Sequence, residues 1–438
     1  NFGMRSPKGL NVSNYPLSGD GKAGDLFPWE RVVDDRNVEG ATAIAVPGTV
    51  DGLGQAHARW GRMPWADLLT PAIAHAREGM LVDWYAALLI ASTARNLARD
   101  PDAAAMFLDD GIWPKGSGWT AIPDNRLDQN GMADSLAHMA QAGARSFYEG
   151  DLAQAMACDV QDKGGSLAAE DLAGYRAWMG AAREVDYRDA RFHVMPGLTA
   201  GPTFTRVMEQ LETADLSTPA STYVAYARAL DRAYSERLGR MGDDGEVPEA
   251  PGCTTHFSVV DRAGNMVTQT QTLLSIFGSR VVSPSTGFLM NNGIMWFDPE
   301  QGRPNSLAPN KACLMNVCPV LGTNENQRFA FGASGGRKIV SAVSQLASFV
   351  VDGGMDVEQA FHTPRIDMSG GAQIIADETL PEDVLAALSK VKPTCTTRRT
   401  VSPYAFACPA GVMRKGDMNS GCTEIMSPWG DAISEDDL

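Results

Sequence analysis

Apolar residues recur three or four positions apart through much of the first half of the chain, a spacing typical of helices with one buried face. This pattern predicts helices within residues 64–97, 127–142, 151–163 and 219–240. Short apolar or alternating runs predict strands at residues 42–46, 184–187 and 191–195. The first half of the chain should therefore be mainly helical, with two neighbouring strands ahead of the longest helix.

A β-hairpin is the clearest pattern in the second half. Residues 254–261, Thr-Thr-His-Phe-Ser-Val-Val-Asp, follow a period of two, and a turn at 262–265 leads to a second such run at 266–274. An acidic segment rich in Gly and Pro, residues 241–252, precedes the hairpin and predicts a solvated loop. Taken alone, Thr254 would begin an ordinary edge strand, in which threonine is common.

The composition is that of a globular protein, with 44% hydrophobic and 21% charged residues. A formal net charge of −16 makes nucleic acid and anionic membrane surfaces poor partners. No apolar run is long enough to span a membrane. The six histidines are scattered, the seven cysteines follow no metal or disulfide spacing, and no nucleotide-binding glycine motif occurs. We therefore expect neither a metal ion nor a cofactor.

A glycine-rich turn at residues 331–340, Phe-Gly-Ala-Ser-Gly-Gly-Arg-Lys-Ile-Val, is a second candidate for chemistry. Consecutive glycines let backbone N–H groups approach a ligand without side-chain obstruction. Two such groups aimed at one point can stabilise an oxyanion, an effect of about 3 kcal/mol per donor. A helix should begin near Arg337 and add positive potential. An ordinary strand-to-helix turn would also favour two glycines.

In combination, these motifs resemble the γ-glutamyltranspeptidase family. The resemblance rests on five segments in the family's order, at residues 47–50 (Pro-Gly-Thr-Val), 254–261, 287–297, 309–319 and 331–340. Members of this family are N-terminal-nucleophile (Ntn) hydrolases, which cut themselves in two and use the freed threonine as nucleophile. The resemblance implies an α+β fold, namely a four-layer αββα sandwich with two central antiparallel sheets.

The resemblance also implies a processing site and a mechanism. Cleavage between Cys253 and Thr254 would give a large-subunit-like fragment, 1–253, and a small-subunit-like fragment, 254–438, which pair as a heterodimer; a higher oligomer is left open. Thr254 would attack the amide carbonyl with its own α-amine as base, since an unperturbed α-amine has a pKa of about 8.

The supporting roles come from the same resemblance. Thr272 would orient the hydroxyl of the nucleophile, and Gly335 and Gly336 would hold the oxyanion. Thr255 is a rival nucleophile, but strand alternation turns it to the opposite face.

The substrate pocket departs from the family's pattern. Transpeptidases carry polar or acidic side chains, which hold the α-amino and α-carboxylate groups of glutamate, where this chain has Leu274, Gly293, Trp296, Met315 and Asn316. A buried ammonium group without acceptors costs several kcal/mol. We therefore expect a small-molecule amide whose acyl group lacks the α-amino function.

A carboxylate on the acyl group would still have a partner. Arg5 is the candidate, with a shift of about two residues from the family's arginine. The family has a helix and a glycine-rich strand before this point, so we expect the chain to begin inside the domain.

Three functional interpretations stay open at this point: a self-processed amidohydrolase with a diverged pocket, a true γ-glutamyltransferase, and a catalytically silent binding protein of the same fold. The unpatterned cysteines suggest reduced thiols and favour a cytoplasmic location. A periplasmic location also stays open, because the expected start of the family is not visible.

Overall fold

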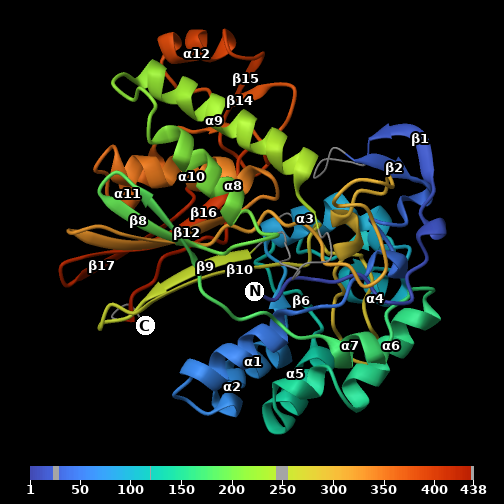
Figure 1. Ribbon diagram of the computed structural model, residues 1–438. Helices are drawn as coiled ribbons and strands as arrows, with labels where there is room; N and C mark the ends of the chain where they lie inside the picture. Colours follow the sequence, from blue (N-terminus) through green and yellow to red (C-terminus); the bar gives the residue numbers. More distant parts are fainter. Residues whose placement is uncertain (23–28, 119, 243–254, 436–438) are drawn as a thin grey trace. The chain divides into compact units, whose positions relative to one another are not determined.

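The computed structural model describes residues 1–22, 29–118, 120–242 and 255–435 (Figure 1). The chain forms two compact units. One consists of Asn1–Met179 with Leu273–Cys313, and the other of residues 180–242, 255–272 and 314–435. Each unit therefore combines residues from before and after position 253.

A six-stranded antiparallel sheet forms the centre of the second unit. Its strand order is β17-β16-β12-β11-β8-β7. The strands are β7 (Arg183–Tyr187), β8 (Ala190–Val194), β11 (Val320–Thr323), β12 (Gln327–Ser334), β16 (Cys408–Lys415) and β17 (Met418–Thr423). Strands β8 and β11 pair from Val194 opposite Val320 to Arg191 opposite Thr323. The sheet thus joins strands that are more than a hundred residues apart in the sequence.

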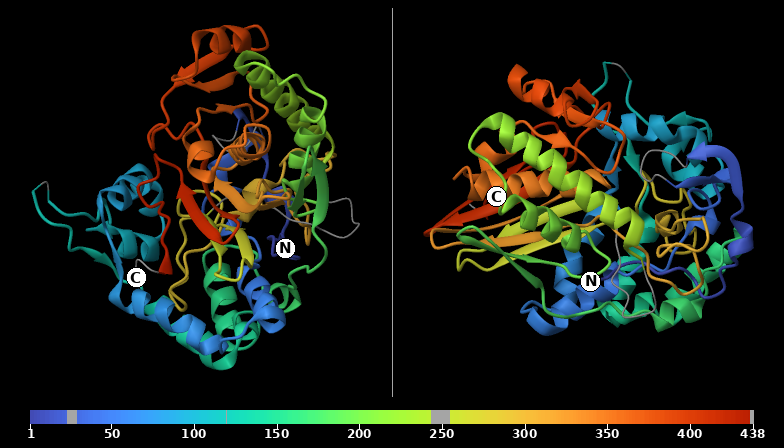
Figure 2. Two further views of the ribbon diagram at one scale, coloured as in Figure 1. Left: turned by 90° about the vertical axis from the view of Figure 1, so that its left-hand side faces the viewer. Right: turned by 45° about the horizontal axis from the view of Figure 1, so that its top comes forward.

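Helices cover one face of this sheet, and the hairpin covers the other (Figures 1 and 2). The helices on the sheet are α8 (Gly201–Leu211), α10 (Lys338–Val351) and α11 (Val357–His362); α9 (Pro219–Arg240) packs on α8, and α12 (Glu382–Ser389) packs on α9 (Figure 1). The hairpin consists of β9 (Thr255–Val260) and β10 (Met266–Gln271). A small three-stranded sheet completes the unit, with β13 (Ile366–Asp367), β14 (Ile374–Asp377) and β15 (Thr394–Thr397).

The alternation of side chains along β12 explains this layering. Phe329, Phe331 and Ala333 point into the apolar core beneath the helices. Gly332, between them, points the other way and lies against His256 of the hairpin. One strand therefore contacts both neighbouring layers.

The first unit is mainly helical. Its α-helices are α1 (Thr49–Trp60), α2 (Trp65–Glu78), α3 (Trp84–Leu97), α4 (Pro101–Phe107), α5 (Asn130–Ala142), α6 (Asp151–Asp162) and α7 (Ala169–Gly174). Its 3-10 helices are η1 (Val12–Asn14), η2 (Val33–Asp35), η3 (Ala41–Ala43), η4 (Ala144–Phe147) and η5 (Gly293–Trp296). Its strands are short: β1 (Leu17–Lys22), β2 (Glu30–Val32), β3 (Met80–Leu81), β4 (Leu108–Asp109), β5 (Trp113–Pro114) and β6 (Arg126–Leu127). No helix in the described ranges has the length and apolarity that crossing a bilayer requires.

Most predicted elements are present, but the strand predicted at residues 42–46 is wrong. Its beginning belongs to η3, and Val46 forms only a single bridge, with Arg5. The Asn291 side chain takes the place of a neighbouring strand. Its Oδ1 accepts a hydrogen bond from the Ala45 N–H at 3.0 Å, and its Nδ2 donates to the Ala45 carbonyl at 2.9 Å. An apolar run can thus be buried without being a strand, because a side chain satisfies its backbone.

Candidate active site

The end of the hairpin is where the sequence places the nucleophile. The last pair of the ladder joins Thr255 to Gln271, and Thr272 follows directly. Thr255 lies on the exposed face of β9, whereas His256 lies on the inner face. Cys253 and Thr254 lie outside the described residues.

A hydrogen-bonded cluster lies on the inner face of the hairpin. His256 Nδ1 is 2.8 Å from Thr270 Oγ1, and its Nε2 is 3.1 Å from Ser258 Oγ and 3.2 Å from Thr268 Oγ1. Gly332 leaves the space for the imidazole, because a Cβ there would lie 2.5 Å from His256 Cε1. Burial lowers the pKa of His256 to about 3, so the ring is neutral at physiological pH.

This buried histidine predicts a loss of stability in acid. The unfolded chain protonates His256 near pH 6.5, whereas the folded protein does so only near pH 3. Between these values the unfolded state binds more protons, so the free energy of unfolding falls as the pH is lowered. Urea unfolding from pH 7.5 to 4.5 should show a shallower pH dependence for His256→Gln. The exposed His362 supplies the control. If His256→Gln and His362→Gln both keep the wild-type slope, His256 is not the group responsible.

The glycine turn after β12 contains two backbone donors, the N–H groups of Gly335 and Gly336. Gly335 and Gly336 both have positive φ, +136° and +58°. Within the described part of the chain, neither N–H donates a backbone hydrogen bond. The turn is fixed on one side by Ser334, whose carbonyl accepts a hydrogen bond from the Tyr404 hydroxyl at 3.1 Å. The following helix, α10, begins at Lys338, as predicted. Two N–H groups without an acceptor among the described residues, beside a helix N-terminus, are suited to an anionic oxygen.

The predicted substrate residues of the first unit are mostly buried. Leu274 is 4% exposed and adopts φ +87°, a conformation that leucine rarely takes. Gly293 is packed tightly: a Cβ there would lie 2.7 Å from Ala45 Cβ and 2.8 Å from Met4 Sδ. Trp296 is fully buried. Two of these positions therefore carry a largely apolar side chain and the third, Gly293, carries none. None of the three offers a carboxylate.

The segment Met315–Asn316 is held by an arginine that the sequence analysis missed. Arg237, in the last turn of α9, donates to the Met315 carbonyl and, from Nε, to Asn316 Oδ1 at 3.2 Å. Asn316 is 2% exposed, and its Nδ2 has no acceptor among the described residues. No spacing in the sequence relates Arg237 to this segment, because a helix end and a distant loop meet only in the fold.

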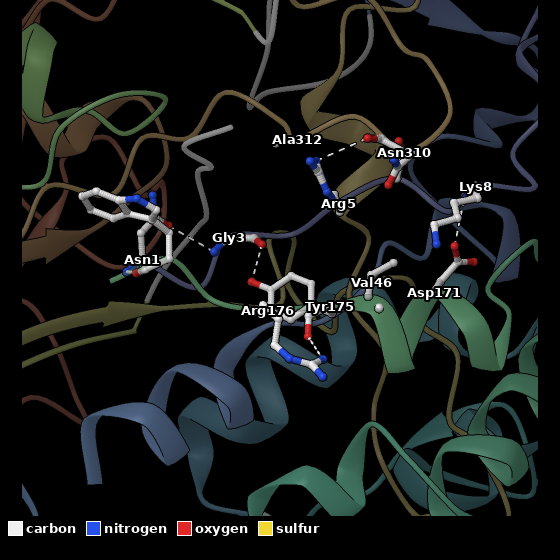
Figure 3. Close-up of a pocket in the computed structure, with 13 residues that line it drawn as sticks. Asn1, Gly3, Arg5, Lys8, Val46, Asp171, Tyr175, Arg176, Asn310 and Ala312 are labelled. Atoms are coloured by element: carbon white, nitrogen blue, oxygen red, sulfur yellow. Dashed lines mark hydrogen bonds between the residues drawn. The ribbon is translucent and has the colours of Figure 1, made fainter. Parts of the chain in front are cut away.

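Arg5 lines a hollow of about 190 Å³ in the first unit (Figure 3). The backbone of Arg5 bridges Val46 on one side and Ala312 on the other. Its guanidinium donates to the Asn310 carbonyl at 3.3 Å and pairs with no carboxylate in the described part of the chain.

The other charged groups of this hollow are mostly cationic. Lys8 and Arg176 line it together with Arg5. Its one acid, Asp171, accepts hydrogen bonds from the N–H groups of Lys8, at 2.9 Å, and Ala168, at 3.0 Å. The hollow therefore favours a small anion such as a carboxylate.

The predicted site residues are divided between the two units. Arg5, Leu274, Gly293 and Trp296 belong to the first, and Thr272, Met315, Asn316, Gly335 and Gly336 to the second. The described residues contain no cluster of His, Cys, Asp and Glu that could hold a metal ion.

Known proteins match both the sequence and the fold. The sequence profile of the gamma-glutamyltranspeptidase family matches residues 18–251 and 246–427. This chain belongs to the γ-glutamyltranspeptidase family. It is thus an Ntn-type amidohydrolase or acyltransferase, as the sequence motifs indicated.

Two kinds of curated relative are found. The acylase ACY 1 proenzyme of Pseudomonas sp. (strain V22) is 31% identical over 396 residues, which are 81% of this chain and 69% of the relative. The glutathione hydrolase proenzyme of Bacillus subtilis (strain 168) is 27% identical over 443 residues, which are 88% of this chain and 72% of the relative. Both names include the term proenzyme.

A solved structure confirms the predicted fold. The cephalosporin acylase from Bacillus halodurans matches with a TM-score of 0.82 at 23% identity, covering 98% of this chain and 83% of that one. The α+β prediction of an Ntn sandwich is therefore correct. Three of its layers, helices, sheet and hairpin, lie within the second unit.

Proposed function

We propose that this chain is a self-processing acylase that hydrolyses or transfers an acyl group with a terminal carboxylate and no α-amino group. The observation that carries the proposal is Arg5, a cation in a small basic hollow with no carboxylate partner among the described residues. A substrate carboxylate would complete this site with a charge-assisted hydrogen bond.

The side chains at three predicted pocket positions offer an ammonium group no acceptor, and this supports the same substrate. Leu274, Gly293 and Trp296 stand where the family's transpeptidases have polar or acidic side chains. An ammonium group buried beside Leu274 and Trp296 would lose hydration without compensation, a cost of several kcal/mol. The similarity to an acylase proenzyme, alongside glutathione hydrolases, is consistent with an acyl group other than γ-glutamyl.

The proposed reaction begins with cleavage of the precursor between Cys253 and Thr254. The Thr254 hydroxyl attacks the Cys253 carbonyl, the acyl group moves from nitrogen to oxygen, and water hydrolyses the resulting ester. Residues 1–253 and 254–438 then form a heterodimer in which Thr254 carries a free α-amine. Thr272 follows Gln271, the partner of Thr255, and is suited to orienting the nucleophile.

Turnover repeats this chemistry on the substrate. Thr254 Oγ bonds to the amide carbon while its α-amine takes the proton, and the carbonyl oxygen becomes an oxyanion held by the N–H groups of Gly335 and Gly336. The C–N bond breaks and the leaving amine takes the proton from the α-ammonium. Water, or an acceptor amine, then attacks the acyl-enzyme and restores the hydroxyl.

A substrate panel tests this proposal. Glutaryl, γ-glutamyl and butyryl amides of one aromatic amine differ only in the carboxylate and the α-amino group. We expect kcat/KM for the glutaryl amide to exceed that for the γ-glutamyl amide by about 100-fold, the equivalent of a few kcal/mol of uncompensated burial. Equal or faster turnover of the γ-glutamyl amide would instead identify a true γ-glutamyltransferase.

Variants of Arg5 test whether this residue binds the carboxylate of the substrate's acyl group. Arg5→Ala should lower kcat/KM for the glutaryl amide by about 10- to 100-fold, as for loss of a hydrogen bond to a charged group, and leave the butyryl amide nearly unchanged. Arg36→Ala, at an exposed arginine of the same unit, is the control. Equal losses on both amides would show that Arg5 does not contact the carboxylate.

A further inference from the structure

The last turns of α9 contact two separate segments of the candidate site. Tyr234 and Arg237 lie three residues apart, and so on one face of the helix, and both are buried. We propose that they are positioning residues: Tyr234 for the oxyanion turn and Arg237 for the substrate segment Met315–Asn316. The inference rests on the proposed function, because it assigns supports to the groups that function requires.

Tyr234 holds the peptide between Arg337 and Lys338, just beyond the glycine pair. Its hydroxyl donates a hydrogen bond to the carbonyl of Arg337. Burial raises the pKa of Tyr234 well above its usual value, so the hydroxyl stays protonated and remains a donor. The N–H of the same peptide group, that of Lys338, donates to the Gly335 carbonyl at 3.1 Å, and this carbonyl shares its peptide group with the Gly336 N–H. Fixing this peptide therefore limits the rotation of the Gly336 N–H.

Arg237 is a buried cation without a carboxylate partner among the described residues. Besides its bonds to Met315 and Asn316, its Nη1 donates to the Thr199 carbonyl at 3.0 Å and to Thr203 Oγ1 at 3.2 Å. Burial lowers the pKa of Arg237 to about 10, so it is still charged at neutral pH. A buried charge without a counter-ion contributes little to the stability of a fold. An apolar side chain of similar size would stabilise the core at least as well. Its presence fits a role in holding the carbonyl and amide groups that it contacts.

The contact with Arg237 also decides which way the Asn316 amide faces. A guanidinium has only donors, so the group that it meets must be the acceptor, Oδ1. The Nδ2 donors of Asn316 then point away from Arg237, and no described residue accepts from them. Buried donors in folded proteins almost always have an acceptor, so an unpaired one indicates a place for a ligand atom. Arg237 thereby orients a donor for a carbonyl or carboxylate oxygen of the substrate.

The two residues should have different kinetic signatures. Tyr234→Phe removes one hydroxyl and keeps the ring, so we expect kcat to fall about tenfold with KM nearly unchanged, and precursor cleavage to slow in parallel. Arg237→Met should raise KM about tenfold or more and change kcat less than about threefold. Arg237→Lys, which keeps the charge but loses the fork of donors, should shift KM in the same direction by less.

A matched control and a double-variant cycle separate positioning from general destabilisation. Tyr226, on the same helix, donates to Ser348 Oγ at 2.8 Å in the core, and Tyr226→Phe should leave both kinetic constants unchanged. If Arg237 acts through Asn316, the KM effects of Arg237→Met and Asn316→Ala should be less than additive.

Four outcomes decide between a positioning role and a structural role. Split effects on kcat and KM, with non-additivity in the cycle, support the proposal. Equal changes in kcat/KM for Tyr234→Phe and Arg237→Lys without a split would overturn it and leave only a structural role. A wild-type protein that is neither cut nor active would remove the proposed function itself, whereas a cut and active wild type with silent Tyr234 and Arg237 variants would remove this inference alone.

Discussion

Replacing Thr254 by Ala should leave the protein as one uncut polypeptide and lower amide hydrolysis by at least about 10³-fold. The expected effect is large because, in the proposed mechanism, one hydroxyl serves both reactions. In that mechanism it attacks the backbone during maturation and the substrate during turnover, and alanine supplies no nucleophile in its place. Denaturing electrophoresis with intact-mass measurement reports the first loss, and amide hydrolysis reports the second.

Thr255→Ala is the matched control for this experiment. Thr255 lies on the exposed face of β9, so its variant should still yield two fragments, with Thr254 as the new amino-terminal residue. Normal processing of Thr254→Ala together with failure of Thr255→Ala would transfer the nucleophile to the second threonine. An uncut wild type with full activity would remove the N-terminal mechanism altogether.

Gly335→Ala should lower kcat by about 10²- to 10³-fold while changing KM little. A Cβ at this position would lie 2.8 Å from Ala407 Cα, and the backbone has φ +136°, where an L-residue is strained. The turn must therefore shift, and its N–H groups would no longer point at the oxyanion. Precursor cleavage should slow as well, because the proposed cleavage uses the same oxyanion site.

The cost of a positive φ can be measured separately at Gly354. This glycine has φ +62°, and a Cβ there meets nothing within 4 Å. Gly354→Ala should lower the free energy of unfolding by about 1 kcal/mol and leave kcat unchanged. If Gly335→Ala has no larger effect on kcat than Gly354→Ala, the turn is not the oxyanion site.

The sequence predicts local structure well where a pattern is long or has a clear end. The helix predicted at residues 219–240 is α9 with the same ends, Pro219 and Arg240, because a proline suits the first turn. The hairpin was predictable for a similar reason, since two alternating runs flank a short turn. The run at residues 42–46 is too short for its pattern to distinguish a strand from a buried loop.

The site is less predictable because its supports are distant in the sequence. The glycine pair can be recognised from the sequence alone, and both glycines do adopt positive φ. Nothing in the sequence connects Tyr234 to Arg337, or Arg237 to Asn316, since each contact depends on how α9 packs. The basic surroundings of Arg5 likewise include Arg176, which is far from Arg5 in the sequence and reaches the hollow only in the fold.

The pairing of β8 with β11 has a consequence for the matured protein. Strand β8 belongs to the proposed fragment 1–253 and β11 to the fragment 254–438, yet they are neighbours inside one sheet. Separating the fragments would break a main-chain ladder and open the core beneath it. The matured enzyme should therefore stay together at any dilution that keeps it folded. A nick at residue 253 would thus be invisible to gel filtration, and each fragment expressed by itself should aggregate, because it would expose an unpaired strand edge.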